Sequence, residues 1–220
     1  MIKFESPKVT VDIVIFTIYN DKLHTLLIQR KGQPFQNSWA LPGGFLEKDE
    51  PLIGAAGREL FEETGVSRIY LEQLYSFGDP GRDPRGRVIT VAYFALVPAP
   101  LEISAGSDAK SAKWWPVGSL PKLAFDHKRI INYALERLRA KLEYTNVAWS
   151  LLPDKFTLTD LQRTYEIVWG KKMDKRNFRK KILSLGLLAQ SKEMRTGFHQ
   201  RPSHLYYFES KKKTELKRFF

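Results

Sequence analysis

The first part of the chain alternates strand-like stretches with helical ones. Apolar residues recur with period two from Val9 to Ile15, the spacing of a β-strand with one buried face. Further strands are predicted at residues 23–29, 70–77, 88–97 and around Trp114-Trp115. Helices are predicted before Gly65, because glycine favours a helix end, and over residues 126–142, where apolar residues share one face. Strands interleaved with helices predict an α/β fold.

The pattern changes after Leu142. Residues 146–155 are predicted to be a short connector, followed by a helix that begins at Thr157, forms a capping arrangement with Asp160 and ends at Gly170. A second helix is predicted from the N-cap Asp174 to residue 186, and two strands follow at residues 187–194 and 203–208. Two capped helices and a hairpin predict a winged helix-turn-helix. We therefore expect two domains, residues 1–145 and 146–220.

Charge is distributed unevenly between these two parts. The chain has 36 Lys and Arg residues against 24 Asp and Glu residues, a net charge of +12, and residues 146–220 carry +10 of it. Clustered cations favour binding to a polyanion, because phosphate backbones release condensed counterions when they are neutralised. The alternative is a solubilising surface together with the lysine-rich tail at residues 211–218.

Composition excludes several classes of protein. A chain with 43% hydrophobic and 27% charged residues is typical of folded domains rather than disordered ones. The absence of cysteine excludes disulfides, thiolate metal sites and cysteine nucleophiles. No apolar run approaches the roughly 20 residues of a membrane span, and no export signal is recognisable. We therefore expect a cytoplasmic protein without a membrane partner.

A cluster of glutamates on the predicted helix before Gly65 indicates a metal site. Glu59, Glu62 and Glu63 fall within an arc of about 100° on a helix. Carboxylates this close raise one another's pKa, and Mg²⁺ or Mn²⁺ relieves the repulsion because such hard ions prefer oxygen ligands. A metal held there can bridge phosphate oxygens and activate water, and Arg58 is placed to orient a carboxylate. The alternative is a solvated acidic helix face.

The spacing from Gly44 to Val66 resembles the Nudix box at every specified position. It reads Gly44, five residues, Glu50, seven residues, Arg58-Glu59-Leu60, one residue, Glu62-Glu63, one residue, Gly65-Val66. The resemblance covers about residues 1–145 and implies a Nudix α/β/α sandwich with a mixed sheet, acting on a nucleoside diphosphate linked to another moiety. It implies catalytic roles for Arg58, Glu59, Glu62 and Glu63, and metal binding by Gly44, Glu59, Glu62 and Glu63.

The loop at residues 77–87 looks like the segment found in ADP-ribose-type Nudix proteins. Its three arginines are candidates for clamping a diphosphate bidentately, and Arg82 is the one we favour. We assign ligand binding to Arg30, Gly43, Gly44, Asp79 and Arg82. The alternative is a surface hairpin held by Asp–Arg pairs. The sequence does not identify the base that would activate water, and we look for it in residues 102–113, which include Asp108.

The second helix of the basic domain carries residues typical of a DNA reader. If Phe178 faces inward, Arg176 and Lys180 point nearly opposite to it, with Asn177 and Arg179 on the flanks. The wing adds two further arginines. We predict DNA contacts at Lys172, Arg176, Asn177, Arg179, Lys180, Arg195 and Arg201. The alternative is a small helical adaptor whose cations are merely solvated.

Taken together, the two halves resemble the Nudix-related transcriptional regulator family (NrtR-like). The stretches 156–166, 173–181 and 201–206 look like the C-terminal pattern of that family. The resemblance implies a homodimeric repressor of NAD-metabolism genes that binds operator double-stranded DNA and senses ADP-ribose through its Nudix pocket. Because the Nudix box is intact, a second hypothesis stays open: a Mg²⁺-dependent pyrophosphatase of ADP-ribose or a nucleotide sugar, with an accessory basic domain.

Overall fold

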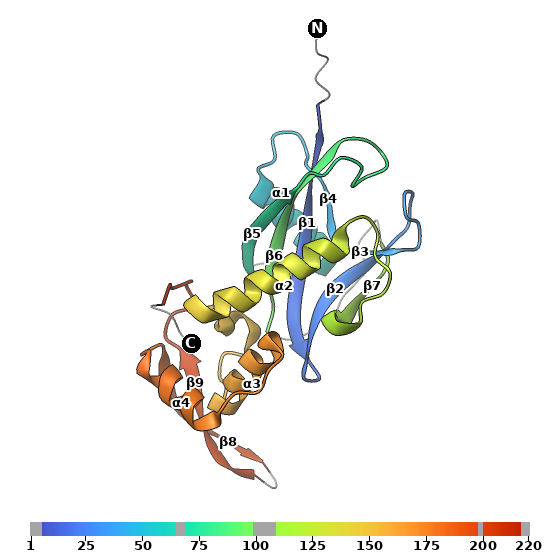
Figure 1. The fold of residues 1–220 in the computed structure, drawn as a ribbon. Helices are drawn as coiled ribbons and strands as arrows, with labels where there is room; N and C mark the ends of the chain where they lie inside the picture. Colours follow the sequence, from blue (N-terminus) through green and yellow to red (C-terminus); the bar gives the residue numbers. More distant parts are fainter. Residues whose placement is uncertain (1–5, 65–68, 99–108, 198–199, 217–220) are drawn as a thin grey trace. The chain divides into compact units, whose positions relative to one another are not determined.

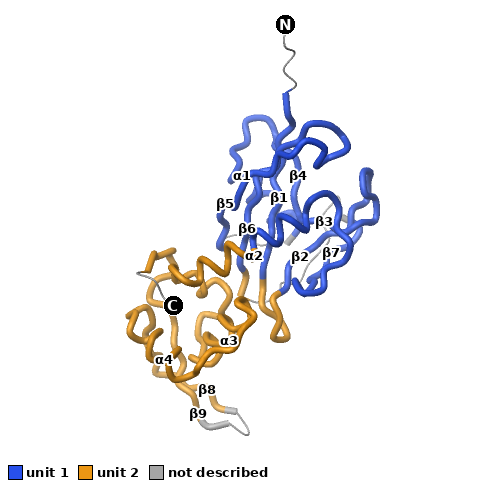
Figure 2. Tube along the Cα trace, in the orientation of Figure 1, with its two compact units in different colours: residues 1–16, 24–96, 100–134 blue, residues 17–23, 97–99, 135–220 orange. Residues whose placement is uncertain are grey.

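The structure, a computed structural model, describes residues 6–64, 69–98, 109–197 and 200–216. The chain divides into two compact units, coloured separately in Figure 2. The first comprises residues 1–16, 24–96 and 100–134, and the second comprises residues 17–23, 97–99 and 135–220. The division falls inside helix α2 (His127–Tyr144), whereas the predicted border follows this helix. In the described ranges no helix combines the length and apolarity needed to cross a bilayer.

A seven-stranded mixed sheet forms the frame of the first unit (Figure 1). Strands β1 (Lys8–Tyr19) and β6 (Val88–Leu96) run parallel at its centre. The path through the sheet is β3-β2-β1-β6-β5, while β4 pairs with β1 and β7 pairs with β2. The remaining strands are β2 (Lys22–Arg30), β3 (Trp39–Ala40), β4 (Gly43–Phe45), β5 (Tyr70–Phe77) and β7 (Ala109–Pro116).

Helix α1 (Leu52–Thr64) and the first half of α2 cover opposite faces of this sheet (Figure 1). Ala55 and Ala56 of α1 are fully buried, because their small side chains let the helix approach the strands closely. Ile130 and Ile131 are fully buried on α2. The predicted α/β/α arrangement with a mixed sheet is confirmed. Gly65 and Val66, the last residues of the Nudix-box spacing, lie outside the described residues.

Two short strands lie between β2 and α1, in a segment where the apolar pattern of the sequence predicts none. β3 pairs with Ile28 and Gln29 of β2, and β4 pairs with β1 so that Gly43 faces Asp12. Gly43 has a φ of 152°, and a Cβ at this position would lie 2.2 Å from the carbonyl oxygen of Val11. Only glycine allows the two backbones to approach this closely. Strands of two and three residues are too short to show a period in the sequence.

The second unit contains α3 (Leu158–Trp169), α4 (Lys175–Ser184), β8 (Leu188–Gly197) and β9 (Gln200–Phe208). The predicted capping box is confirmed: Thr157 Oγ1 accepts from the Asp160 N–H at 3.1 Å, and Asp160 Oδ2 accepts from the Thr157 N–H at 2.8 Å. Gly170 ends α3 in the left-handed conformation, and Asp174 caps α4. The predicted winged helix-turn-helix is confirmed.

The segment expected to be a connector is part of the core of the second unit. It contains a short 3₁₀ helix, η2 (Val147–Leu151), in which Val147, Ala148 and Leu151 are buried. A similar 3₁₀ helix, η1 (Val117–Ser119), follows β7 in the first unit. The sequence interpretation gave too little weight to the apolar residues of this segment.

Candidate ligand cavity and nucleic-acid interface

A cavity of about 580 Å³ lies within the first unit. This volume is in the range of sites that hold nucleotide-sized ligands. Its walls differ in charge: glutamates of α1 line one part, whereas Arg30, Lys31 and Arg85 line another. Two aromatic side chains, Phe45 and Phe125, also line the cavity, as do Asp12, Asp83 and His127.

Helix α1 supplies the acidic part through Glu59, Glu62 and Glu63, as the box spacing predicts. Arg58 holds this cluster in place: its Nη1 donates to Glu59 Oε1 at 2.8 Å and to Glu62 Oε2 at 3.5 Å. Its Nε also donates to Glu50 Oε1 at 2.9 Å, and this contact lowers the pKa of Glu50. The position of Arg58 therefore suits the carboxylate-orienting role expected for it.

Glu59 is buried, and burial is the main cause that raises its pKa. The hydrogen bond from Arg58 acts in the opposite direction, and repulsion from Glu62 contributes less than burial. The sequence interpretation named repulsion, so it gave the smaller cause for this group. A Cβ at Gly44 would lie 2.2 Å from Glu59 Oε1, so a larger residue at this position would displace the Glu59 carboxylate.

The donor set of this cluster fits a hard divalent cation. Three carboxylates on adjacent turns of one helix open into the cavity, and oxygen ligands of this kind suit Mg²⁺ or Mn²⁺. Among the residues that the structure describes, however, no three acidic or histidine side chains converge in ligand geometry. Arg58 lies between Glu59 and Glu62 instead. A cation bound here must therefore replace part of the hydrogen bonding of Arg58.

In the cationic part of the cavity, two guanidinium groups lie close to aromatic rings. Arg30 lies 5.0 Å from the centroid of Phe125, and Arg85 lies 5.0 Å from Phe45 and 5.6 Å from Phe125. Burial lowers the pKa of Arg30, and the like charge of Arg85 lowers it further. Two neighbouring guanidinium groups repel each other through their like charges, and an anion such as a diphosphate that binds between them relieves this repulsion.

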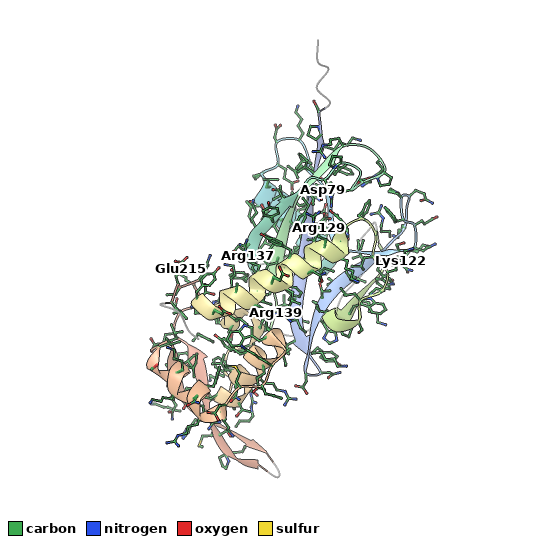
Figure 3. All side chains as sticks on the ribbon, in the orientation of Figure 1. Asp79, Lys122, Arg129, Arg137, Arg139 and Glu215 are labelled. Atoms are coloured by element: carbon green, nitrogen blue, oxygen red, sulfur yellow. The ribbon has the colours of Figure 1, made fainter. Side chains whose placement is uncertain are left out.

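Two residues assigned to the ligand from the sequence lie elsewhere. Arg82 is buried in ion pairs with Asp126 at 2.7 Å and Asp12 at 3.4 Å, and it is not among the residues that line the cavity. Asp79 forms an ion pair with Arg129; both residues are labelled in Figure 3. In the same loop Arg85 faces the cavity and also pairs with Asp83 at 2.6 Å. Arg30, Gly43 and Gly44 do line it.

A buried histidine, His127, was missed from the sequence, where nothing distinguishes it from a packing residue. Its Nδ1 accepts a hydrogen bond of 2.8 Å from the Leu41 N–H, so the ring proton lies on Nε2, 3.5 Å from Asp12 Oδ1. Burial lowers the pKa of His127, although Asp12 opposes the shift. The ring is thus a neutral donor at the cavity wall. Asp108, where a water-activating base was sought, lies outside the described residues.

The residues predicted to contact DNA fall into two sets in the second unit. On α4, Phe178 is buried, and Arg176, Asn177 and Lys180 are exposed. The others make internal contacts: Lys172 with Glu166 at 3.1 Å, Arg179 with Thr159 at 3.2 Å, and Arg195 with Asp160 at 2.8 Å. The side chain of Arg201 lies outside what the structure describes. α4 therefore presents exposed cationic side chains, Arg176 and Lys180.

Comparison with known proteins gives matches to both units. Residues 8–134 match the NUDIX domain family, and residues 148–208 match the NrtR DNA-binding winged helix domain family. The ADPR responsive transcriptional repressor NtrR of Acinetobacter baylyi is 40% identical over 209 residues, which cover 93% of this chain and 83% of that protein.

Two solved structures from Shewanella oneidensis are similar to this chain. NrtR complexed with a 27mer DNA has a TM-score of 0.80 at 37% identity, covering 91% of this chain and 93% of that one. The NUDIX domain of NrtR complexed with ADP ribose has a TM-score of 0.57 at 40% identity, covering 61% of this chain and 90% of that one. The resemblance inferred from the sequence is confirmed, and the chain belongs to the NrtR family, in which a Nudix domain precedes a winged helix domain.

Proposed function

We propose that this protein is a transcriptional repressor that binds operator DNA through its winged helix and senses ADP-ribose in the cavity of its Nudix domain. The observation that carries the proposal is the presence, in one chain, of a nucleotide-sized cavity with acidic and cationic walls and an exposed cationic helix α4. ADP-ribose is the part of NAD that remains when nicotinamide leaves, so genes of NAD metabolism are the natural targets of such a sensor.

In this proposal the two walls of the cavity bind different parts of the ligand. Arg30 and Arg85 hold the diphosphate, since a guanidinium group binds phosphate oxygens bidentately. Phe45 and Phe125 provide flat apolar surface for the adenine or a ribose. Glu59, Glu62 and Glu63 hold Mg²⁺ or Mn²⁺, which when bound would supply positive charge to phosphate oxygens and lower the pKa of a coordinated water.

The DNA interface in this proposal is α4. Arg176 and Asn177 have the donor groups that read guanine and adenine edges in the major groove, and Lys180 meets a phosphate. A homodimer would place two such helices on the half-sites of a palindromic operator, because a two-fold symmetric protein matches a two-fold symmetric sequence. Sedimentation analysis of the free protein tests the dimer directly.

The test of the repressor proposal is binding to duplexes selected from a random library, at fixed salt, with and without ADP-ribose. Selected duplexes should bind more tightly than random ones, and ADP-ribose should weaken that binding, whereas AMP alone should have a smaller effect. The Arg176→Ala variant should lose about 1–3 kcal/mol on the selected duplex and less on the random one. Absence of any sequence preference across a salt series would refute the proposal.

The intact Nudix box favours a second candidate, a Mg²⁺-dependent ADP-ribose pyrophosphatase. Arg58 orients Glu59 through a 2.8 Å contact, and all three glutamates line the cavity. Hydrolysis would release AMP and ribose 5-phosphate, which chromatography detects. Turnover by the wild type that is lost in Glu62→Gln supports this activity, and turnover that ignores the substitution places catalysis elsewhere. The two functions are compatible, since an enzyme can hydrolyse its own effector.

A further inference from the structure

The first turn of α3 contacts both the wing and the second helix of the winged-helix unit. Asp160 accepts a hydrogen bond of 2.8 Å from Arg195 of β8, the first wing strand. One residue earlier, Thr159 Oγ1 accepts from Arg179 of α4 at 3.2 Å. This turn is therefore the point at which the two elements predicted to meet DNA are held together.

The carboxylate of Asp160, which accepts the hydrogen bond from Arg195, is also held in place by a second contact that does not involve Arg195. Asp160 Oδ2 accepts the Thr157 N–H at 2.8 Å as part of the capping box of α3. An exposed ion pair ordinarily gains little because two flexible side chains must be ordered. In this pair only Arg195 has to be ordered, so the contact specifies a position for the wing.

The wing strand is irregular on both sides of Arg195. Its pairing with β9 (Gln200–Phe208) shifts register between Gln190 and Met194, and again between Arg195 and Gly197. Such irregularities bend a hairpin and re-aim the side chains between them. The orientation of the segment that carries Arg195 is therefore set by its contact with α3 as well as by the backbone pairing of β8 with β9.

We propose that Arg195 is a positioning residue, which sets the wing for DNA binding through Asp160 and does not itself neutralise a phosphate. This inference rests on the proposed function, because it assumes that the winged helix binds an operator. A phosphate contact and a positioning contact differ in one measurable way. Each phosphate that a protein neutralises adds about 0.9 to the magnitude of the slope of log K against log salt concentration, whereas an internal ion pair adds nothing.

The experiment is a salt titration of operator affinity for the wild type, Arg195→Ala, Asp160→Asn, the double variant, and Lys180→Ala as the matched phosphate control. The asparagine side chain in Asp160→Asn retains an oxygen that can accept the Thr157 N–H, so the cap is preserved, whereas the negative charge that attracts Arg195 is lost. We expect Arg195→Ala and Asp160→Asn each to weaken operator binding by about tenfold with an unchanged slope. The double variant should be no weaker than either single variant, and Lys180→Ala should reduce the slope by about 0.9.

Several outcomes overturn the inference. A slope reduced by about 0.9 in Arg195→Ala identifies a phosphate contact. Unchanged affinity in Arg195→Ala, or tighter binding in Asp160→Asn, shows that the pair does not position the wing. Melting curves without DNA identify a variant that fails to fold, and the Arg195→Ala slope decides the matter if Asp160→Asn is unstable. A wild type without operator preference refutes the proposed function instead, so the two failures are distinguishable.

Discussion

The guanidinium group of Arg82 donates a hydrogen bond of 2.7 Å to Asp126, the residue that precedes α2, and only 4% of the Arg82 side chain is exposed. Burial lowers the pKa of Arg82, but the hydrogen bond to Asp126 and the negative charges of Asp12, Asp126 and Asp83 together raise it overall. Asp12 lies on its other side at 3.4 Å. Arg82 therefore ties the loop before β6 to the start of α2 as a structural ion pair.

The Arg82→Ala substitution should destabilise the protein more than it affects the ligand. Removing one partner of a buried ion pair leaves the carboxylates of Asp12 and Asp126 without their cation, at a cost of about 3–5 kcal/mol. Denaturant unfolding measures this loss. The matched control is Arg129→Ala, which breaks an exposed ion pair with Asp79 and should cost less than about 1 kcal/mol. Wild-type stability combined with lost ADP-ribose binding would show that Arg82 meets the ligand instead.

The Arg30→Gln substitution should have the opposite effect, weakening ligand binding more than it destabilises the protein. It removes one of the two guanidinium groups in the cationic part of the cavity, so affinity for ADP-ribose should fall by about 10–100-fold, as calorimetry can measure. Stability without ligand should change by less than about 3 °C, because the lost contact with Phe125 is offset by relief from Arg85. Unaltered affinity would remove Arg30 from the ligand site.

His127 predicts a particular dependence of stability on pH. Burial lowers its folded-state pKa below the ordinary value of about 6.5, so the unfolded chain binds a proton that the folded chain does not. Stability should therefore fall as pH drops below about 6.5, by up to about 1.4 kcal/mol per pH unit from this group. His127→Asn keeps an acceptor for the Leu41 N–H and should flatten this decline between about pH 7 and about pH 5. If the stability of the two proteins fell equally as the pH was lowered, the prediction would be contradicted.

Divalent cations should stabilise the protein through the glutamates of α1. At 100 times its dissociation constant, Mn²⁺ adds about 2.7 kcal/mol, a rise of about 5–10 °C in melting temperature that a chelator reverses. Glu62→Gln should abolish the rise, with little effect on the metal-free protein because Glu62 is half exposed. Glu47→Gln is the matched control, since Glu47 is more exposed and lies 3.9 Å from Arg58. An equal rise in all three proteins would place the cation elsewhere.

Features that depend on neighbouring residues were predictable from the sequence. β5 spans residues 70–77, as the apolar pattern predicts, and the capping box between Thr157 and Asp160 forms with both hydrogen bonds. The carboxylates of α1 line one cavity because a helix brings residues three and four apart onto the same face. Each of these signals is contained in a few consecutive residues, so no knowledge of distant parts was needed.

The local sequence therefore determined the two domain types, the helix ends and the acidic face of α1, since backbone geometry alone relates those positions. Only the tertiary structure decided which arginine of one loop faces the cavity: Arg82 meets Asp126, 44 residues away, and Arg85 turns to Phe45 and Phe125. The same holds for His127 with Asp12 and for Arg195 with Asp160. Such contacts follow from packing between distant segments, which leaves no period or spacing in the chain.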